Sequence, residues 1–190
     1  MTHPNVLGAG STALLVIDVQ EKFRAAMAGF GPMAAACARL VRAARLLDVP
    51  VFITEQYPKG LGPTAPEVLE ALAGAGSHGE AGIPEKTRFS CLGCAGLAER
   101  IRSTGARAAL LCGIETHVCV SQTAHDLLAE KYAVHIATDA VESRRPSDRE
   151  AGLRKMERSG AVLTTSEMAV FEMMGDARHP RFREVQALFK

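Results

Sequence analysis

Short apolar runs alternate along this chain with longer segments of helical spacing. The runs show little alternation between apolar and polar positions, which is typical of strands covered on both faces of a sheet. We expect strands at residues 13–17, 51–54, 108–112, 133–137 and 161–164. The spacing predicts helices at 33–47, 66–73, 95–103, 118–131, 148–158, 167–174 and 182–189. The segment from Ser147 to Glu150 fits a capping box that opens the helix at 148–158.

A strand–helix–strand order repeated along a chain implies right-handed crossovers and a parallel sheet between layers of helices. We therefore predict an α/β fold, a three-layer α/β/α sandwich with a mainly parallel sheet of about six strands. The sixth strand is expected to be short and central, around Lys86. Residues 1–190 are expected to form a single domain, with the Gly- and Pro-rich stretch 56–86 as a functional loop.

Composition excludes several classes of protein. Hydrophobic residues make up 47% of the chain and charged residues 23%, which is ordinary for a soluble globular protein. The net charge of +1 and the lack of a basic block argue against a nucleic-acid partner. No signal peptide or membrane-spanning run is visible. A chain of this size does not need disulfide bonds for stability, so the five cysteines are not expected to pair. We expect a cytoplasmic protein with reduced thiols and no membrane partner.

Three reactive side chains fall where parallel strands should end. Asp18 follows the first strand, Cys119 falls in the first turn of the helix after the strand at 108–112, and Lys86 follows the long loop. Ligands bind at the carboxyl ends of such strands. Each residue alone has an ordinary explanation: a turn-forming aspartate, a small core cysteine and a solvated lysine. Their joint placement at strand ends favours a catalytic site.

The motifs around these residues resemble those of the isochorismatase-like cysteine hydrolases. They are LVIDVQ at 15–20, KTRFS at 86–90 and LCGIETHVCV at 111–120, in the order that the family has. The segments TEQYPKGLGP at 54–63 and TTSEM at 164–168 look like the subgroup called isochorismatase domain-containing proteins. The resemblance covers nearly the whole chain.

The resemblance implies a role for each reactive residue. Cys119 would be the nucleophile, Asp18 the acceptor and later donor of its proton, and Lys86 the cation between them. It also implies a cis peptide bond between Ile114 and Glu115. Backbone N–H groups of Ile114, Glu115 and Cys119 would then hold the substrate oxygen.

The resemblance agrees with simple thiol chemistry. A free thiol is mostly protonated at neutral pH and needs activation to attack a carbonyl. A nearby ammonium and a helix start favour the thiolate, and a neighbouring carboxylate can take the proton. We therefore expect a hydrolase that cleaves a small amide-like C–N bond through a thioester on Cys119.

Neither a metal nor another cofactor is expected. The metal-dependent nicotinamidases of the family carry Asp-x-His after the second strand, whereas this chain has TEQY at 54–57. Several converging N and O ligands would be needed for a metal site. The substrate is instead expected to be a small molecule held by pocket residues, which we predict to be Gln20, Phe23, Gln56, Tyr57 and Val118.

Three further features have plainer explanations. A G-x-G-x-x-G match at 74–79 follows a helix instead of a strand, so it predicts a loop and not a nucleotide site. Cys91 and Cys94 lack a second ligand pair and are expected to be buried thiols. His117 is two residues from Cys119 and diverges from it, so we do not expect a catalytic base. Whether His117 and Arg88 contact substrate stays open.

Three other functions remain as alternatives. A vinyl-ether hydrolase of the isochorismatase type would use Asp18 as its acid and leave Cys119 as a bystander. A non-catalytic binding protein would have an ordinary, unreactive thiol. A nuclease is the least favoured, because the sequence lacks both a metal cluster and a basic face. Relatives commonly form homo-oligomers, and we expect the same of this chain.

Overall fold

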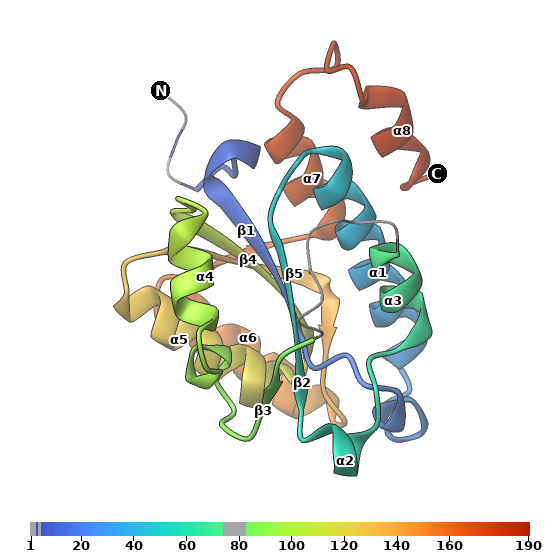
Figure 1. Cartoon of the computed structure of the whole chain (residues 1–190), viewed down its shortest axis with the longest axis vertical. Helices are drawn as coiled ribbons and strands as arrows, with labels where there is room; N and C mark the ends of the chain where they lie inside the picture. Colours follow the sequence, from blue (N-terminus) through green and yellow to red (C-terminus); the bar gives the residue numbers. More distant parts are fainter. Residues whose placement is uncertain (1–2, 4, 74–82) are drawn as a thin grey trace.

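A parallel sheet forms the centre of the computed structural model, which describes residues 3, 5–73 and 83–190. In these residues the strands lie in the order β3-β2-β1-β4-β5-β6, and every pair is parallel (Figure 1). Their bounds are β1 Thr12–Ile17, β2 Val51–Gln56, β3 Glu85–Lys86, β4 Ala108–Ile114, β5 Ala133–Glu142 and β6 Val162–Thr164. The predicted three-layer α/β/α fold is confirmed.

Helices cover both faces of the sheet. Their bounds are α1 Phe30–Leu46, α2 Pro58–Leu61, α3 Pro66–Leu72, α4 Leu97–Ser103, α5 Ser121–Ala129, α6 Pro146–Arg158, α7 Ser166–Met174 and α8 Phe182–Ala187. Helices α1, α3, α7 and α8 lie on one side, and α4, α5 and α6 lie on the other (Figure 1). Short helical turns at Glu21–Ala26, Cys91–Gly93 and Thr116–Val120 follow or precede the strands that carry the site.

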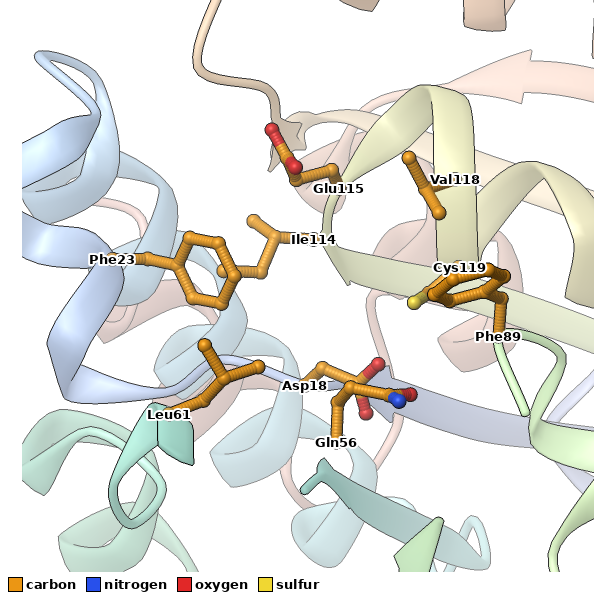
Figure 2. A pocket seen from close by; sticks show the side chains of 9 residues that line it. All are labelled: Asp18, Phe23, Gln56, Leu61, Phe89, Ile114, Glu115, Val118 and Cys119. Atoms are coloured by element: carbon orange, nitrogen blue, oxygen red, sulfur yellow. The ribbon is translucent and has the colours of Figure 1, made fainter. Parts of the chain in front are cut away.

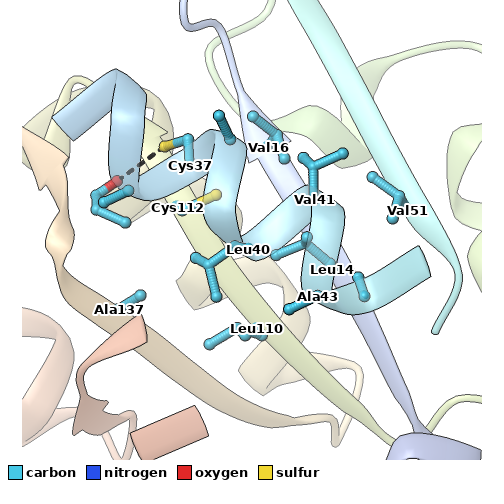
Figure 3. Close-up of a cluster of buried hydrophobic side chains, with 14 of the residues drawn as sticks. Leu14, Val16, Cys37, Leu40, Val41, Ala43, Val51, Leu110, Cys112 and Ala137 are labelled. Atoms are coloured by element: carbon cyan, nitrogen blue, oxygen red, sulfur yellow. Dashed lines mark hydrogen bonds between the residues drawn. The ribbon is translucent and has the colours of Figure 1, made fainter. Parts of the chain in front are cut away.

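Strand β1 shows why the apolar runs lack alternation. Leu14 and Val16 point into the core beneath α1, which Figure 3 shows, while Leu15 and Ile17 point into the core beneath α4 and α5. Successive strand residues face opposite sides of a sheet, so a strand covered on both sides must be apolar at every position. In the same core, the Cys37 thiol donates to the Ala140 carbonyl at 3.3 Å.

Two local predictions were wrong. Helix α6 begins at Pro146, and no side chain caps it, so Ser147 lies inside the first turn and forms no capping box. Proline is well suited to the first helical position because its φ is already helical and it has no N–H to satisfy. Strand β3 is two residues long and lies at the edge of the sheet, not in its centre.

The register of β1 with β2 and β4 determines which residues meet at the carboxyl ends of these strands. Ile17, the last residue of β1, pairs with Thr54 of β2 on one side and with Gly113 of β4 on the other. Gly113 has a φ of +112°, and a Cβ atom built there would lie 2.1 Å from the Ile17 carbonyl oxygen. Only glycine permits this approach. The carboxyl ends of β1, β2 and β4 therefore meet in a narrow space.

Some expectations concern single segments. The G-x-G-x-x-G match at 74–79 lies outside the described residues. All five cysteines are free and buried. Within the described part of the chain, none of the helices combines the length and the apolar character needed to span a bilayer.

Candidate functional site

A pocket opens at the carboxyl ends of β1, β2 and β4, the place where the chain order of the strands reverses. Open parallel sheets bind ligands at such a switch point. The pocket has a volume of about 120 Å³ and a mixed lining with more apolar than acidic or amide side chains. The lining residues are Asp18, Phe23, Gln56, Leu61, Phe89, Ile114, Glu115, Val118 and Cys119 (Figure 2).

Asp18 is the first residue after β1 and has a left-handed backbone, with a φ of +52°. Its N–H donates to the Thr54 carbonyl at 3.1 Å, which continues the sheet pairing. Its carboxylate accepts a hydrogen bond from the Thr54 hydroxyl at 2.8 Å and one from Lys86 at 2.6 Å. Both carboxylate oxygens are thus held, and the side chain faces the pocket from a fixed position.

Lys86 is buried beside Asp18, and each N–H of its ammonium group has a hydrogen-bond acceptor. Its ammonium donates to Asp18, to the Gln56 side-chain carbonyl at 2.8 Å and to the Phe89 carbonyl at 2.9 Å. Burial acts to lower the pKa of Lys86, but the charge of Asp18 raises this pKa above its ordinary value. Burial raises the pKa of Asp18, although the Lys86 charge opposes this effect. At neutral pH the two groups form an ion pair.

Cys119 lies in a π-helical turn, Thr116–Val120, between β4 and α5. Single π turns are frequent at functional sites. The Val120 N–H donates to the Glu115 carbonyl at 3.2 Å, which is the five-residue step of such a turn. In Figure 2 the Cys119 sulfur points into the pocket toward the Asp18 carboxylate.

The expected resting thiolate on Cys119 is not what the structure favours. Burial and the negative charge of Asp18 raise the pKa of Cys119 well above its ordinary value, and Lys86 opposes them only in part. The reason is geometric, because Lys86 directs its N–H groups at Asp18, Gln56 and backbone carbonyls instead of the sulfur. The resting thiol keeps its proton next to a carboxylate that can receive it.

The peptide bond between Ile114 and Glu115 is cis. In residues 5–73 and 83–190, no acceptor meets the Glu115 N–H. The Glu115 carboxylate accepts from the backbone N–H of Arg144 at 3.0 Å and from its guanidinium at 3.1 Å. This pairing fixes the side chain of Glu115, a residue that lines the pocket.

The predicted wall residues divide into two groups. Phe23, Gln56 and Val118 line the pocket (Figure 2), but Gln20 and Tyr57 do not. Gln20 is fully buried, and its amide bonds to the backbone of Gln56 and Gly62, so it supports the wall from behind. Tyr57 is 55% exposed and is the N-cap residue that precedes helix α2.

Sequence reasoning missed two wall residues, Leu61 and Phe89. Leu61 ends the short helix α2 in the long loop, where no periodic pattern identifies an inward face. Phe89 stands three residues after Lys86 in the KTRFS motif, and this spacing was the available signal for it. Both are apolar, so they shape the pocket without carrying chemistry.

His117, the histidine nearest to Cys119 in the sequence, does not line the pocket. The His117 ring contacts the Ser143 hydroxyl at 3.0 Å and lies 3.9 Å from the Asp148 carboxylate. With Arg88 it lines a separate groove beside the pocket. Among the residues that the structure describes, no cluster of three or more His, Cys, Asp or Glu side chains could hold a metal ion.

Comparison with known proteins places these residues in a family. A sequence model of the isochorismatase domain matches residues 12–168. The isochorismatase domain-containing protein 2 of Xenopus laevis is 44% identical over 183 residues, 96% of this chain and 85% of that protein.

Two solved structures share the fold. A Caenorhabditis elegans protein described as MAR1 ribonuclease is 40% identical, with a TM-score of 0.86 over 96% of this chain and 91% of that one. The Escherichia coli YcaC gene product, described as an octameric hydrolase of unknown specificity, has a TM-score of 0.79 at 20% identity and covers 97% and 96%. The chain belongs to the isochorismatase family and is a hydrolase.

Proposed function

We propose that this hydrolase cleaves a small amide-like C–N bond through a thioester on Cys119, without a catalytic metal. One observation carries the proposal: the Asp18 carboxylate, held by Lys86 at 2.6 Å, and the Cys119 thiol face one pocket. Acyl transfer needs a nucleophile, a proton acceptor and donors for the oxyanion. Each of these has a candidate here.

Attack begins with a proton transfer. The Cys119 S–H proton moves to the Asp18 carboxylate as the sulfur forms a bond to the carbonyl carbon of the substrate. The carbonyl π electrons move onto the oxygen, which becomes an oxyanion. Coupling the two events avoids a free thiolate, which the raised pKa of Cys119 disfavours.

Asp18 then works in the opposite direction. It gives its proton to the leaving nitrogen as the C–N bond breaks, which leaves an amine and a thioester on Cys119. Asp18 next takes a proton from water, and the hydroxide attacks the thioester carbon. The C–S bond breaks, the acid product leaves, and the sulfur recovers its proton from Asp18.

Lys86 keeps this carboxylate ionised despite burial. A buried carboxylate without a cation becomes neutral and accepts no proton. The pair therefore supplies a base in a largely buried site, where the charges act more strongly on the reacting atoms than they would in bulk water. The free N–H of Glu115 and the N–H of Cys119 are the proposed oxyanion donors, beside the side chain of Ile114.

The pocket limits the size of the substrate. A cavity of about 150 Å³ in another protein holds one benzene molecule, and this pocket has about 120 Å³. The reacting end of the substrate is therefore a small group of about half a dozen heavy atoms. Its apolar part would rest against Phe23, Leu61 and Phe89 while its carbonyl faces Cys119.

The test is a substrate panel of small amides, carbamoyl compounds, isochorismate and RNA. The wild type is compared with Asp18→Asn, Lys86→Ala and Cys119→Ala. We expect amide turnover in the wild type, its loss by a factor of about 10³ or more in the Cys119 and Asp18 variants, and an acyl adduct on Cys119 in mass spectra with a slow substrate. Cys37→Ala is the control, because it removes a buried thiol on the other face of the sheet.

The remaining functions appear as distinct outcomes of this panel. Isochorismate turnover that survives Cys119→Ala would identify a vinyl-ether hydrolase that uses Asp18 alone. RNA cleavage without amide turnover would contradict the proposal and would agree with the description of the C. elegans relative. A Cys119 thiol that reacts with alkylating agents no faster than a free model thiol would indicate a binding protein.

We also propose that the chain forms a homo-oligomer. The octameric description of the E. coli YcaC gene product, which shares this fold, supports testing it. Light scattering after size-exclusion chromatography should give a mass that is a multiple of the 20.2 kDa chain. A monomer at all concentrations would refute this part and leave the proposed chemistry standing.

A further inference from the structure

A buried polar chain behind the pocket has no role in the proposed reaction. It consists of Thr54 on β2, Cys91 in the turn before α4, and Thr123 on α5, whose exposed fractions are 2%, 0% and 0%. It starts at the Asp18 carboxylate and ends at the Cys119 carbonyl. The proton acceptor and the nucleophile are thus linked a second time, on the side away from the substrate.

The hydrogen bonds at the Asp18 end have a defined direction. The Thr54 hydroxyl donates to Asp18 at 2.8 Å and lies 3.4 Å from the Cys91 sulfur. A hydroxyl has one proton to donate and can accept with its lone pairs. Since its proton goes to Asp18, the Cys91 thiol is the donor to Thr54. Burial raises the pKa of Cys91 to about 11, so this thiol keeps its proton at neutral pH.

The other end of the chain is anchored to the backbone that carries the nucleophile. The Cys91 N–H donates to the Thr123 hydroxyl oxygen at 3.0 Å. The Thr123 hydroxyl donates to the Cys119 carbonyl at 2.7 Å. Cys91 is therefore fixed relative to α5, and through its thiol it fixes the Thr54 hydroxyl relative to Asp18.

We propose that Thr54 and Cys91 are positioning residues that hold the Asp18 carboxylate in its ionised form and aim it at the Cys119 thiol. The inference rests on the proposed function, because it assigns a purpose to the proton acceptor of that reaction. A hydrogen bond donated to the charged form of an acid stabilises that form. Polarised by the Cys91 thiol, the Thr54 hydroxyl is a better donor than it would be alone.

The experiment measures alkylation of Cys119 by iodoacetamide as a function of pH, with the modified cysteine located by mass spectrometry. It needs no substrate. The alkylation rate should fall at low pH, because a protonated Asp18 no longer accepts the proton of the Cys119 thiol. We call this part of the pH profile the acid limb. Thr54→Val removes the hydroxyl and keeps the shape, so we expect this acid limb to move to higher pH by about one unit. Thr54→Ser keeps the hydroxyl and should keep the wild-type limb.

Cys91 is tested separately, and thermal unfolding verifies that each variant is folded. Cys91→Ala should move the limb in the same direction as Thr54→Val but by less, and Cys91→Ser should restore it. If Thr54→Val does not fold, the Cys91 pair of variants carries the test. An unmoved limb in Thr54→Val and Cys91→Ala, or an equal shift in Thr54→Ser, would overturn the inference alone. A wild-type Cys119 no more reactive than a free model thiol would instead refute the proposed function.

Discussion

Lys86 Nζ lies 2.6 Å from Asp18 Oδ2, and the two side chains are 0% and 3% exposed. The residues are 68 positions apart in sequence and come from two strands that do not touch, because β2 lies between β1 and β3. A buried ion pair of this kind is costly to break, since removal of one partner leaves an isolated charge in the interior. The ion pair thus links the edge strand β3 to the carboxyl end of β1.

We predict that Lys86→Met lowers the free energy of unfolding by about 3–5 kcal/mol at neutral pH. Urea titration measures the free energy of unfolding. Lys155→Met is the control, because Lys155 is exposed on α6. The control should stay within about 0.5 kcal/mol of the wild type.

The loss in Lys86→Met should depend on pH. Without its cation, Asp18 keeps the hydrogen bond from Thr54 but loses the Lys86 charge that opposes burial, so its pKa rises further. An acid with a raised pKa in the folded state stabilises the fold at low pH and loses that contribution as pH rises. The difference between variant and wild type should therefore shrink from pH 7 toward pH 5. A constant difference would show that lost packing, not charge, accounts for the effect.

Gly113→Ala should unfold the protein or destabilise it by about 3 kcal/mol or more. The added Cβ would lie 2.1 Å from the Ile17 oxygen and 2.7 Å from the Ile17 nitrogen, and φ is +112°. Gly10→Ala is the matched control, since a Cβ there meets nothing within 4 Å. Thermal or urea unfolding of both variants checks this, and equal stabilities would contradict the close approach of β4 to β1.

Phe89→Ala should broaden substrate size. Phe89 lines the pocket, and removal of its ring enlarges the space next to Cys119. We expect larger amides to be accepted and KM for the smallest ones to rise several-fold, with a smaller change in kcat. Tyr57→Ala is the control, because Tyr57 is equally aromatic and exposed but lies outside the lining. Its kinetic constants should match the wild type.

His135 should make stability depend on pH below neutrality. It is buried on β5, and neither ring nitrogen meets a hydrogen-bond partner in the described residues. Burial lowers its pKa, although Glu172 opposes the effect. The unfolded chain then binds a proton more readily, so stability is lost as pH falls below about 6.5.

Replacement of His135 tests this directly. His135→Leu should flatten the slope of unfolding free energy against pH between about 7 and 5, a slope of at most about 1.4 kcal/mol per pH unit from this group. His3→Gln, at an exposed position, should leave the slope unchanged. An unaltered slope in His135→Leu would show that other groups cause any acid sensitivity.

Much of the fold could be predicted because its signals are local. The apolar runs mark strands that are covered on both faces, and five of the observed strands begin within one residue of the predicted starts. Strand ends were less predictable. β5 continues to Glu142 because pairing with the end of β4 extends it past its apolar run.

The site was predictable only where the side chains carry chemistry. Asp18, Lys86 and Cys119 were identifiable as candidates from strand ends and motifs, but the direction in which Lys86 points depends on the backbone carbonyls of Arg88 and Phe89, which side-chain patterns do not place. The same limit applies to Gln20, whose amide bonds to backbone groups of Gln56 and Gly62. These hydrogen-bond partners are brought together by the tertiary structure, so they could not be predicted from the pattern of residues along the chain.

The pairing of Ile17 with Thr54 and Gly113 has a consequence for how this enzyme can diversify. Sliding either neighbour by one residue would turn every side chain of that strand to the opposite face. The packing of these strands in the core therefore fixes the spacing between the Asp18 carboxylate and the Cys119 thiol. The side chains of Leu61 and Phe89, which line the pocket, lie outside these paired strands. New specificities are therefore expected to arise by exchange at those two surface segments, while the reactive centre stays constant.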